Sequence, residues 1–238
     1  MEDKPSYGEE KAMTDDNKIL PNTDADLAER LKVRFDDYRR LMTYYSCAMM
    51  EIETKFKVLN SQFSLSREYN PIETIKTRLK SPESILEKLQ RRGIPLDVVA
   101  VENSIYDIAG VRVICPFIDD IYLLVDCLLS QDDIKLIEKK DYIEHPKTNG
   151  YRSLHLIVEI PIFLYNEKRM MKVEVQFRTI AMDFWASLEH RIRYKKDLDE
   201  KLAQTLASEL KFCAETSAQL DIRMEDIKNR IQEAKITS

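Results

Sequence analysis

The stretch MKVEVQFRTIAMDFWASLEH, residues 171–190, decides the fold of this chain. Side chains change sides at every residue of a β-strand, so Val173 and Val175 would share one face and Glu174 and Gln176 the other. The apolar helix that follows at once is expected to bury against the sheet. Polar side chains on a strand that a helix covers so closely suit the wall of a cleft. A solvent-exposed surface strand, in which polar and apolar residues also alternate, gives the same pattern.

Length and composition restrict the class of protein. The chain has 238 residues, 33% of them charged, and a net charge of −5. This is enough for one domain with its own core and appended helices. The negative charge argues against extended binding to nucleic acid or an anionic membrane, but it allows a local basic pocket. The four cysteines lie far apart without CxxC spacing, which favours buried thiols over a zinc site or disulfides.

Targeting signals are not evident in the sequence. No run is long and apolar enough to span a bilayer, and the acidic first ten residues do not resemble a signal peptide. We therefore expect a cytoplasmic protein.

The periodicity of apolar residues indicates helices at both ends. Residues 1–22 are polar and acidic and are expected to form a disordered tail, with Thr23 as the N-cap of a helical region over 23–70. A second helical region is expected over 197–238. In both, apolar residues recur with spacings of four and three, which is typical of helices that pack against a partner. They would pack on the domain, on each other, or between chains.

Residues 71–196 are expected to form an α/β (α+β) domain with a mixed sheet of about five strands. Ser81 and Pro82 predict the start of a helix, and Gly93 predicts its end. The expected strands cover 72–80, 106–117, 154–160 and 171–178, and a further strand begins at 134–137. Pro161 is expected to close the strand over 154–160.

Two groups of residues in this domain have the chemistry of an anion or metal site. Lys80, Ser84 and Lys88 recur at fourfold spacing near a helix N-terminus, a suitable bed for phosphate, and a solvated basic face is an equal alternative. Asp107 precedes a core strand. It either caps a turn or completes a Mg²⁺ site with Glu174, since one or two carboxylates plus substrate phosphates usually hold that ion.

The segment KKDYIEHPKTNGYRSLH, residues 139–155, combines basic and aromatic residues. Cations suit the phosphates of a nucleotide and an aromatic ring suits its base. The alternative is a solvated hairpin loop with Tyr151 packed on the surface. We favour the nucleotide, because the segment leads into a strand expected beside the one that carries Glu174.

Together these motifs resemble those of the RelA/SpoT-type synthetases. The resemblance rests on DIAGVR at 107–112, KDYI at 140–143, PKTNGYRSLH at 146–155, and EVQFRT at 174–179 followed by MDFWASLEH. It covers about residues 71–196 and leaves no room for the hydrolase domain of the long bifunctional enzymes. The chain is therefore similar to the single-domain small alarmone synthetases, of the RelP-like kind, which build homotetramers through flanking helices.

The resemblance implies a nucleotidyltransferase-like synthetase fold and a GTP diphosphokinase. Such an enzyme transfers the β,γ-diphosphate of ATP to the 3′-hydroxyl of GDP or GTP and makes the stringent-response alarmones ppGpp and pppGpp. It implies Mg²⁺ on Asp107 and Glu174, with Glu174 also as the base. The ATP-binding residues would be Arg78, Lys80, Ser84, Lys88 and Arg112. The GDP/GTP-binding residues would be Lys140, Lys147, Asn149, Tyr151, His155, Gln176 and Arg178.

Two residues depart from the family pattern. Thr77 stands where many relatives have glycine, which affects the approach of the backbone to ATP. Glu138 stands where the bifunctional enzymes have arginine, so their preference between GDP and GTP does not carry over. The alternatives to an alarmone synthetase are an enzyme that transfers pyrophosphate to another acceptor, such as tRNA, and a non-catalytic nucleotide- or RNA-binding regulator.

Overall fold

The computed structural model describes residues 24–66, 69–193 and 200–236, and contacts divide the chain into two units, Met1–Tyr38 and Arg39–Ser238. The larger unit contains the sheet. The expected tail and Thr23 lie outside the described residues. The helices are α1 (Asp24–Ser66), α2 (Pro82–Arg92), α3 (Val98–Ser104), α4 (Ile118–Leu129), α5 (Ile180–Arg193) and α6 (Glu200–Ile236). The strands are β1 (Thr74–Leu79), β2 (Ala109–Cys115), β3 (Lys135–Asp141), β4 (Leu154–Phe163) and β5 (Lys168–Thr179).

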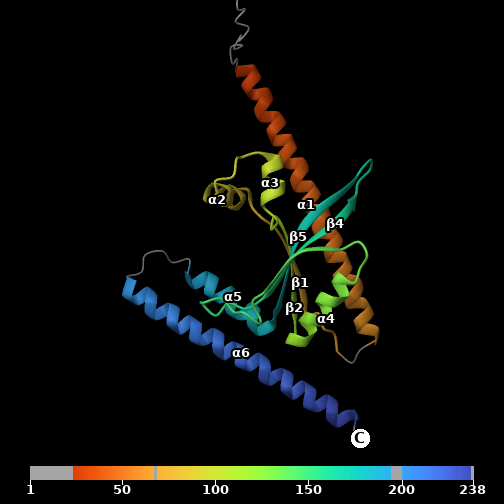
Figure 1. The fold of residues 1–238 in the computed structure, drawn as a ribbon, viewed down its shortest axis with the longest axis vertical. Coiled ribbons are helices and arrows are strands. Elements are labelled where there is room, and N and C mark those ends of the chain that lie inside the picture. The colour runs from red at the N-terminus through yellow and green to blue at the C-terminus, as the bar shows by residue number, and fades with distance from the viewer. Residues whose placement is uncertain (1–23, 67–68, 194–199, 237–238) are drawn as a thin grey trace, which may run out of the picture. The chain divides into compact units, whose positions relative to one another are not determined.

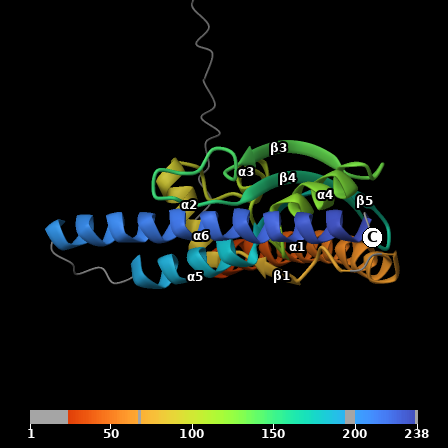
Figure 2. The same ribbon diagram turned by 90° about the horizontal axis from the view of Figure 1, so that it is seen from below.

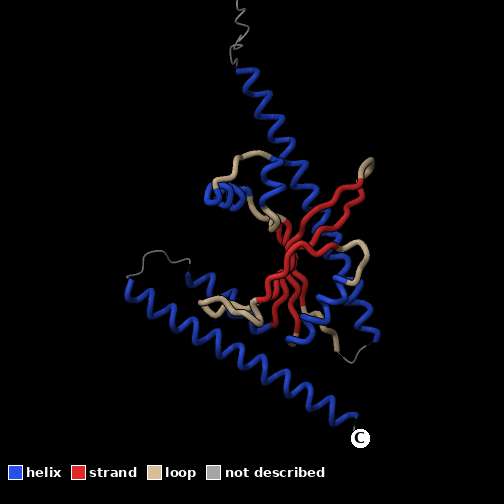
Figure 3. Tube along the Cα trace, in the orientation of Figure 1, coloured by secondary structure: helices blue, strands red, loops and turns tan. Residues whose placement is uncertain are grey.

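The five strands form one mixed sheet, as the sequence predicts, and their order is β1-β2-β5-β4-β3 (Figure 1). β2 and β5 run parallel at its centre, and the other neighbouring pairs are antiparallel. Figure 3 shows the strands as a twisted layer with helices on both sides. The central pair is thus the part of the sheet most enclosed by other elements.

The alternation expected in β5 is confirmed. Val173, Val175 and Phe177 are fully buried, while Glu174 and Gln176 on the opposite face are partly exposed. The ring of Phe177 meets that of Phe56 on α1 edge to face, with 5.7 Å between the ring centroids. The portion of α1 from Arg39 onward therefore covers the apolar face of the sheet, and its apolar residues pack mainly within the domain.

Helix α6 packs beside α5, as Figure 2 shows. Trp185 on α5 donates from Nε1 to the carbonyl oxygen of Leu210, 2.9 Å away, and packs against Ala214. Beyond this contact, Leu220, Met224 and Ile227 of α6 remain exposed. Among the described residues, no helix combines the length and the apolar character needed to cross a membrane.

The structure corrects two sequence-based expectations and adds one helix. Pro161 does not close β4, which continues to Phe163 with Pro161 opposite Met170 of β5. The β3–β4 ladder ends at the pair Lys135–Glu159, so no neighbour on that side needs the missing N–H of Pro161. Lys139 and Lys140 belong to β3 rather than to a loop. Helix α3 was not expected at all.

Helix boundaries follow the local sequence where caps are present. The Oγ atom of Ser81 accepts from the backbone N–H of Ser84, and Pro82 is the first residue of α2. Gly93 ends that helix with φ of 64°, the left-handed conformation that glycine adopts without steric cost. Helix α1 covers Asp24–Ser66, within the helical region expected over 23–70.

Candidate active site

The register of the sheet aligns polar side chains from all five strands on one face. In one row across the sheet the opposed residues are Lys76, Arg112, Gln176, His155 and Lys140. In the next row they are Arg78, Gly110, Glu174, Ile157 and Glu138. Residues two apart in a strand point to the same side, so the two rows form one continuous surface.

The larger cavity on this surface has a volume of about 420 Å³ and is lined by residues of β1, β2, β5 and α2. Four of the five residues expected to bind ATP line it, namely Arg78, Lys80, Ser84 and Arg112. Asp107 and Glu174 line it as well. The fifth expected residue, Lys88, reaches the Asp107 carboxylate from α2. The structure thus brings the cationic residues and both carboxylates together.

Asp107 is held by two lysines that come from different elements. Its Oδ2 atom lies 2.8 Å from Nζ of Lys80 and 2.7 Å from Nζ of Lys88. Burial alone would raise the pKa of Asp107, but the two lysine hydrogen bonds hold it below its ordinary value. Its Oδ1 atom is buried without a hydrogen-bond partner. A buried carboxylate oxygen left without a donor is suited to a cation.

A smaller cavity of about 240 Å³ lies on the β3 and β4 side of the sheet. It is lined by Lys140, Lys147, His155, Glu138, Tyr142, Ile157 and Glu174. The first three were expected to bind the acceptor nucleotide. Glu174 is the one residue among the described linings that faces both cavities.

Tyr151 stands beside the smaller cavity within a cluster of rings and cations. Its ring centroid is 6.0 Å from that of Tyr142 and 5.9 Å from that of His155. Nζ of Lys147 lies 4.9 Å from the Tyr151 centroid and 4.6 Å from the Tyr142 centroid. Aromatic faces next to a cation are the combination expected for a base and its phosphates.

Three residues expected near the acceptor have other surroundings. Gln176 lines the larger cavity and accepts hydrogen bonds from Arg112 through Oε1. Arg178 is only 6% exposed, and one of its terminal nitrogens donates to the hydroxyl oxygen of Tyr151. Asn149 shapes the preceding loop, because its Oδ1 accepts from the backbone N–H of Tyr151 at 3.2 Å.

The carboxylate of Glu174 is hydrogen-bonded on both oxygens. Nε2 of Gln176 donates to Oε2 at 2.8 Å, and Nδ1 of His155 lies 3.3 Å from Oε1. Burial would raise the pKa of Glu174, but the bond to His155 and then that to Gln176 hold it below its ordinary value. The side chain is therefore a carboxylate at neutral pH and able to accept a proton.

Sequence reasoning missed Lys76, Glu138 and Tyr142 as residues of the cavity walls. Glu138 had been noted only as a departure from the family pattern. For Lys76 and Glu138 the signal is the strand register, which opposes Lys76 to Arg112 and Glu138 to Ile157. A single sequence does not reveal that register.

A mixed sheet with two cation-lined cavities and a shared carboxylate defines a nucleotide-binding transferase. The model of the "Region found in RelA / SpoT proteins" matches residues 77–199. The chain is 45% identical to the GTP pyrophosphokinase YwaC of Bacillus subtilis, over 84% of this chain and 95% of that protein. It is 34% identical to the GTP pyrophosphokinase YjbM of the same organism, over 83% and 92%. The chain therefore belongs to the RelA/SpoT family.

Solved structures agree with this assignment. The small alarmone synthetase 2 of Bacillus subtilis matches with a TM-score of 0.72 and 45% identity, over 82% of this chain and 99% of that one. The small alarmone synthetase 1 of Bacillus subtilis, bound to its product pppGpp, matches with a TM-score of 0.74 and 34% identity, over 82% and 98%. The resemblance seen in the motifs is thus confirmed at the level of the fold.

Proposed function

We propose that the protein is a (p)ppGpp synthetase, a GTP diphosphokinase that transfers the β,γ-diphosphate of ATP to the 3′-hydroxyl of GDP or GTP. The products are AMP and ppGpp or pppGpp, the alarmones of the stringent response. The observation that carries this proposal is the position of Glu174 on the wall of both cavities. A group that removes a proton from one substrate as it attacks the other must reach both.

ATP would occupy the larger cavity. Arg78 and Arg112 lie on the neighbouring strands β1 and β2, in adjacent rows of the same sheet face, and would hold the adenine between their guanidinium groups. Lys80, Ser84 and Lys88 would bind the phosphates near the N-terminus of α2, where backbone N–H groups also favour anions. The donor would then be fixed by cations along its charged portion.

GDP or GTP would occupy the smaller cavity. Tyr151 would stack on the guanine, and Lys140, Lys147 and His155 would surround the acceptor. Asn149 and Arg178 would act by holding Tyr151, which both contact. Gln176 would orient the Glu174 carboxylate.

In the reaction the 3′-oxygen of the acceptor attacks the β-phosphorus of ATP. The bond between that phosphorus and the oxygen that bridges the α- and β-phosphates breaks. AMP leaves with this oxygen, and the hydroxyl proton passes to Glu174. Positioning and charge neutralisation dominate such phosphoryl transfers. The lowered pKa of Glu174 keeps it in the form that accepts the proton.

The site fits Mg²⁺ held by Asp107 and Glu174. Both carboxylates line the larger cavity, and Oδ1 of Asp107 lacks a donor. In the described part of the chain, no three His, Cys, Asp or Glu residues gather as a complete metal site. Mg²⁺ usually takes its remaining ligands from water and substrate phosphates. When bound, Mg²⁺ would neutralise phosphate charge.

The C-terminal helices support a homotetramer. Apolar side chains that stay exposed along α5 and α6 include Ile180, Phe184, Leu188, Phe212, Leu220, Met224, Ile227 and Ile231. Such a row is large for a monomer. Light scattering at micromolar concentration is expected to give four times the mass of the chain, and a monomer would refute this part of the proposal. Since ATP and GTP are cytoplasmic metabolites, we place the enzyme in the cytoplasm.

The proposal is tested by a product assay. Purified protein is incubated with γ-labelled ATP, Mg²⁺ and either GDP, GTP, deacylated tRNA or no acceptor. Labelled ppGpp or pppGpp is expected. Label on tRNA alone would indicate a different acceptor, and nucleotide binding without any product would indicate a regulator.

A further inference from the structure

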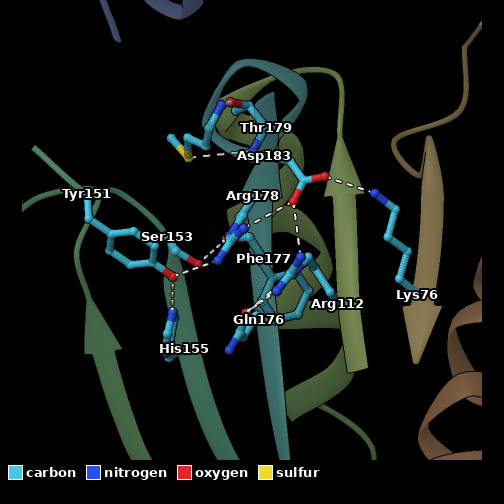
Figure 4. Close-up of polar contacts among 11 residues, drawn as sticks. Lys76, Arg112, Tyr151, Ser153, His155, Gln176, Phe177, Arg178, Thr179 and Asp183 are labelled. Carbon is cyan, nitrogen blue, oxygen red and sulfur yellow. Dashed lines mark hydrogen bonds and ion pairs between the residues drawn. The ribbon is translucent and has the colours of Figure 1, made fainter. Parts of the chain in front are cut away.

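Asp183, in the first turn of α5, joins three strands through its carboxylate. Oδ2 accepts from Nζ of Lys76 on β1 at 2.9 Å, and Oδ1 accepts from Arg112 on β2 at 3.3 Å and Arg178 on β5 at 3.1 Å (Figure 4). Burial alone would raise the pKa of Asp183. The hydrogen bond from Lys76 and the charges of all three cations hold it below its ordinary value. Asp183 is therefore ionised where Arg112 and Arg178 approach each other.

From Asp183 one series of hydrogen bonds runs along the donor side. Arg112 donates to Oε1 of Gln176 through Nε and a terminal nitrogen, each at 3.3 Å. Gln176 then donates from Nε2 to Oε2 of Glu174 at 2.8 Å. All three residues line the ATP cavity.

A second series runs along the acceptor side. Arg178 donates to the Tyr151 hydroxyl at 2.9 Å, and that hydroxyl lies 2.9 Å from Nε2 of His155 (Figure 4). Nδ1 of His155 lies 3.3 Å from Oε1 of Glu174. With the imidazole hydrogen on Nδ1, every hydrogen bond in this series points toward Glu174.

The two series close into a ring of seven side chains, which we call the Asp183–Glu174 ring. Its members are Asp183, Arg112, Gln176, Glu174, His155, Tyr151 and Arg178. Two arginines balance two carboxylates, and each carboxylate receives one bond from either side. Nε of Arg178 is buried without a hydrogen-bond partner, so the hydrogen bonds of its two terminal nitrogens, to Asp183 and Tyr151, hold it in the ring. Hydrogen bonds linked in series polarise and strengthen one another.

We propose that Asp183 is a positioning residue that couples the two substrate cavities through this ring. The reason is electrostatic. Arg112 is partly buried, and this burial and then the charge of Arg178 lower its pKa, so the two guanidinium groups repel each other. Asp183 offsets that repulsion and sets where both arginines stand. The proposal rests on the proposed function, because it assigns Arg112 to the donor and Tyr151 to the acceptor.

Loss of the Asp183 charge would let Arg112 and Arg178 separate. Arg112 would then lose its place beside ATP, and Arg178 would no longer hold the Tyr151 hydroxyl. Both Michaelis constants should rise together, although Asp183 lines neither cavity. For Asp183→Asn we expect each KM to rise about tenfold, as for loss of a charge-assisted hydrogen bond.

The experiment is a double-mutant cycle between Asp183→Asn and Tyr151→Phe, with KM for ATP and for GTP measured in each variant. Tyr151→Phe keeps the ring that stacks and removes only the hydroxyl between Arg178 and His155. If the ring transmits the effect, the double variant should have a GTP KM within about twofold of the worse single variant. If the two residues act separately, the effects should multiply, and the proposal is overturned.

Two further variants separate positioning from simple folding. Asp120→Asn removes a carboxylate that is 2% exposed and accepts from the Tyr69 hydroxyl, away from both cavities, and should leave both KM values unchanged. Asp183→Glu restores the charge and should recover most of the lost affinity. A purely structural role predicts that the longer side chain does worse than asparagine, and that outcome would refute the proposal.

Folding failure does not block the test. If Asp183→Asn gives no folded protein, Arg178→Lys replaces it in the cycle, since lysine keeps the charge beside Asp183 and cannot also reach Tyr151. The wild-type product assay stands apart from these comparisons. An inactive wild type refutes the proposed function, whereas an active wild type with additive variants refutes only the coupling.

Discussion

Replacing Glu174 by glutamine is expected to abolish product formation while the protein stays folded. Glutamine has the same shape but accepts on one oxygen only, so either Gln176 or His155 loses its acceptor. An unpaired buried donor costs about 1–3 kcal/mol, but the variant also removes the penalty for a buried charge. We therefore expect a loss of about 1 kcal/mol in the free energy of unfolding, or about 2–4 °C in Tm.

The loss in rate should be far larger than the loss in stability. General base catalysis contributes about 10²–10⁴-fold, which corresponds to about 2.7–5.5 kcal/mol of activation free energy. The assay follows label from ATP into ppGpp or pppGpp under saturating substrates, with Tm measured on the same preparation. Glu159→Gln is a matched control, since Glu159 is also a strand carboxylate, with 21% of its side chain exposed against 18% for Glu174. A kcat within about tenfold of wild type would show that Glu174 is not the base.

The remaining predictions concern the acceptor, pH and one turn. Tyr151→Ala should raise KM for GTP about 5- to 150-fold, from lost stacking of about 1–3 kcal/mol, with a smaller change for ATP; equal changes would place Tyr151 elsewhere. Because the pKa of Glu174 is lowered, kcat should stay constant as pH falls from about 7 to 5 and decline only below, as the carboxylate gains its proton; a decline centred near pH 6 would contradict this. Gly150→Ala should lower the free energy of unfolding by about 2–4 kcal/mol, because φ is 87° and the new Cβ would lie 2.5 Å from Cβ of Ala214. Gly93→Ala is its control in a urea melt, having a similar φ of 64° and no atom within 4 Å, and equal losses would exclude the steric clash.

Patterns within a single strand or helix were enough to predict much of the fold. The alternation around Glu174 identified the polar face of β5, and Ser81 and Gly93 marked both ends of α2. Helix α3 was not predicted because its seven residues are too few to show a clear helical periodicity of apolar side chains. Pro161 misled because the cost of its missing N–H depends on whether a neighbouring strand is present, which only the assembled sheet decides.

The site was predictable in its residue types but less so in its arrangement. Lys80 lies before α2 and Lys88 within it, yet both meet at Asp107. The two lysines had been grouped from the sequence because their spacing suggested one common helix, which is not how they meet. Asp183 was passed over because two of its three partners, Lys76 on β1 and Arg112 on β2, are far away in the chain. Contacts of that kind depend on register, which local periodicity does not contain.

The order of the strands also bears on how such an enzyme changes its preferences. The shared carboxylate, Glu174, stands on the central strand, where any shift in register would disturb both cavities at once. The two departures from the family pattern, Thr77 and Glu138, lie on the outermost strands β1 and β3, each on the wall of one cavity. A substitution at Thr77 or Glu138 would therefore alter the wall of one cavity alone, while Glu174 on the central strand continues to serve both.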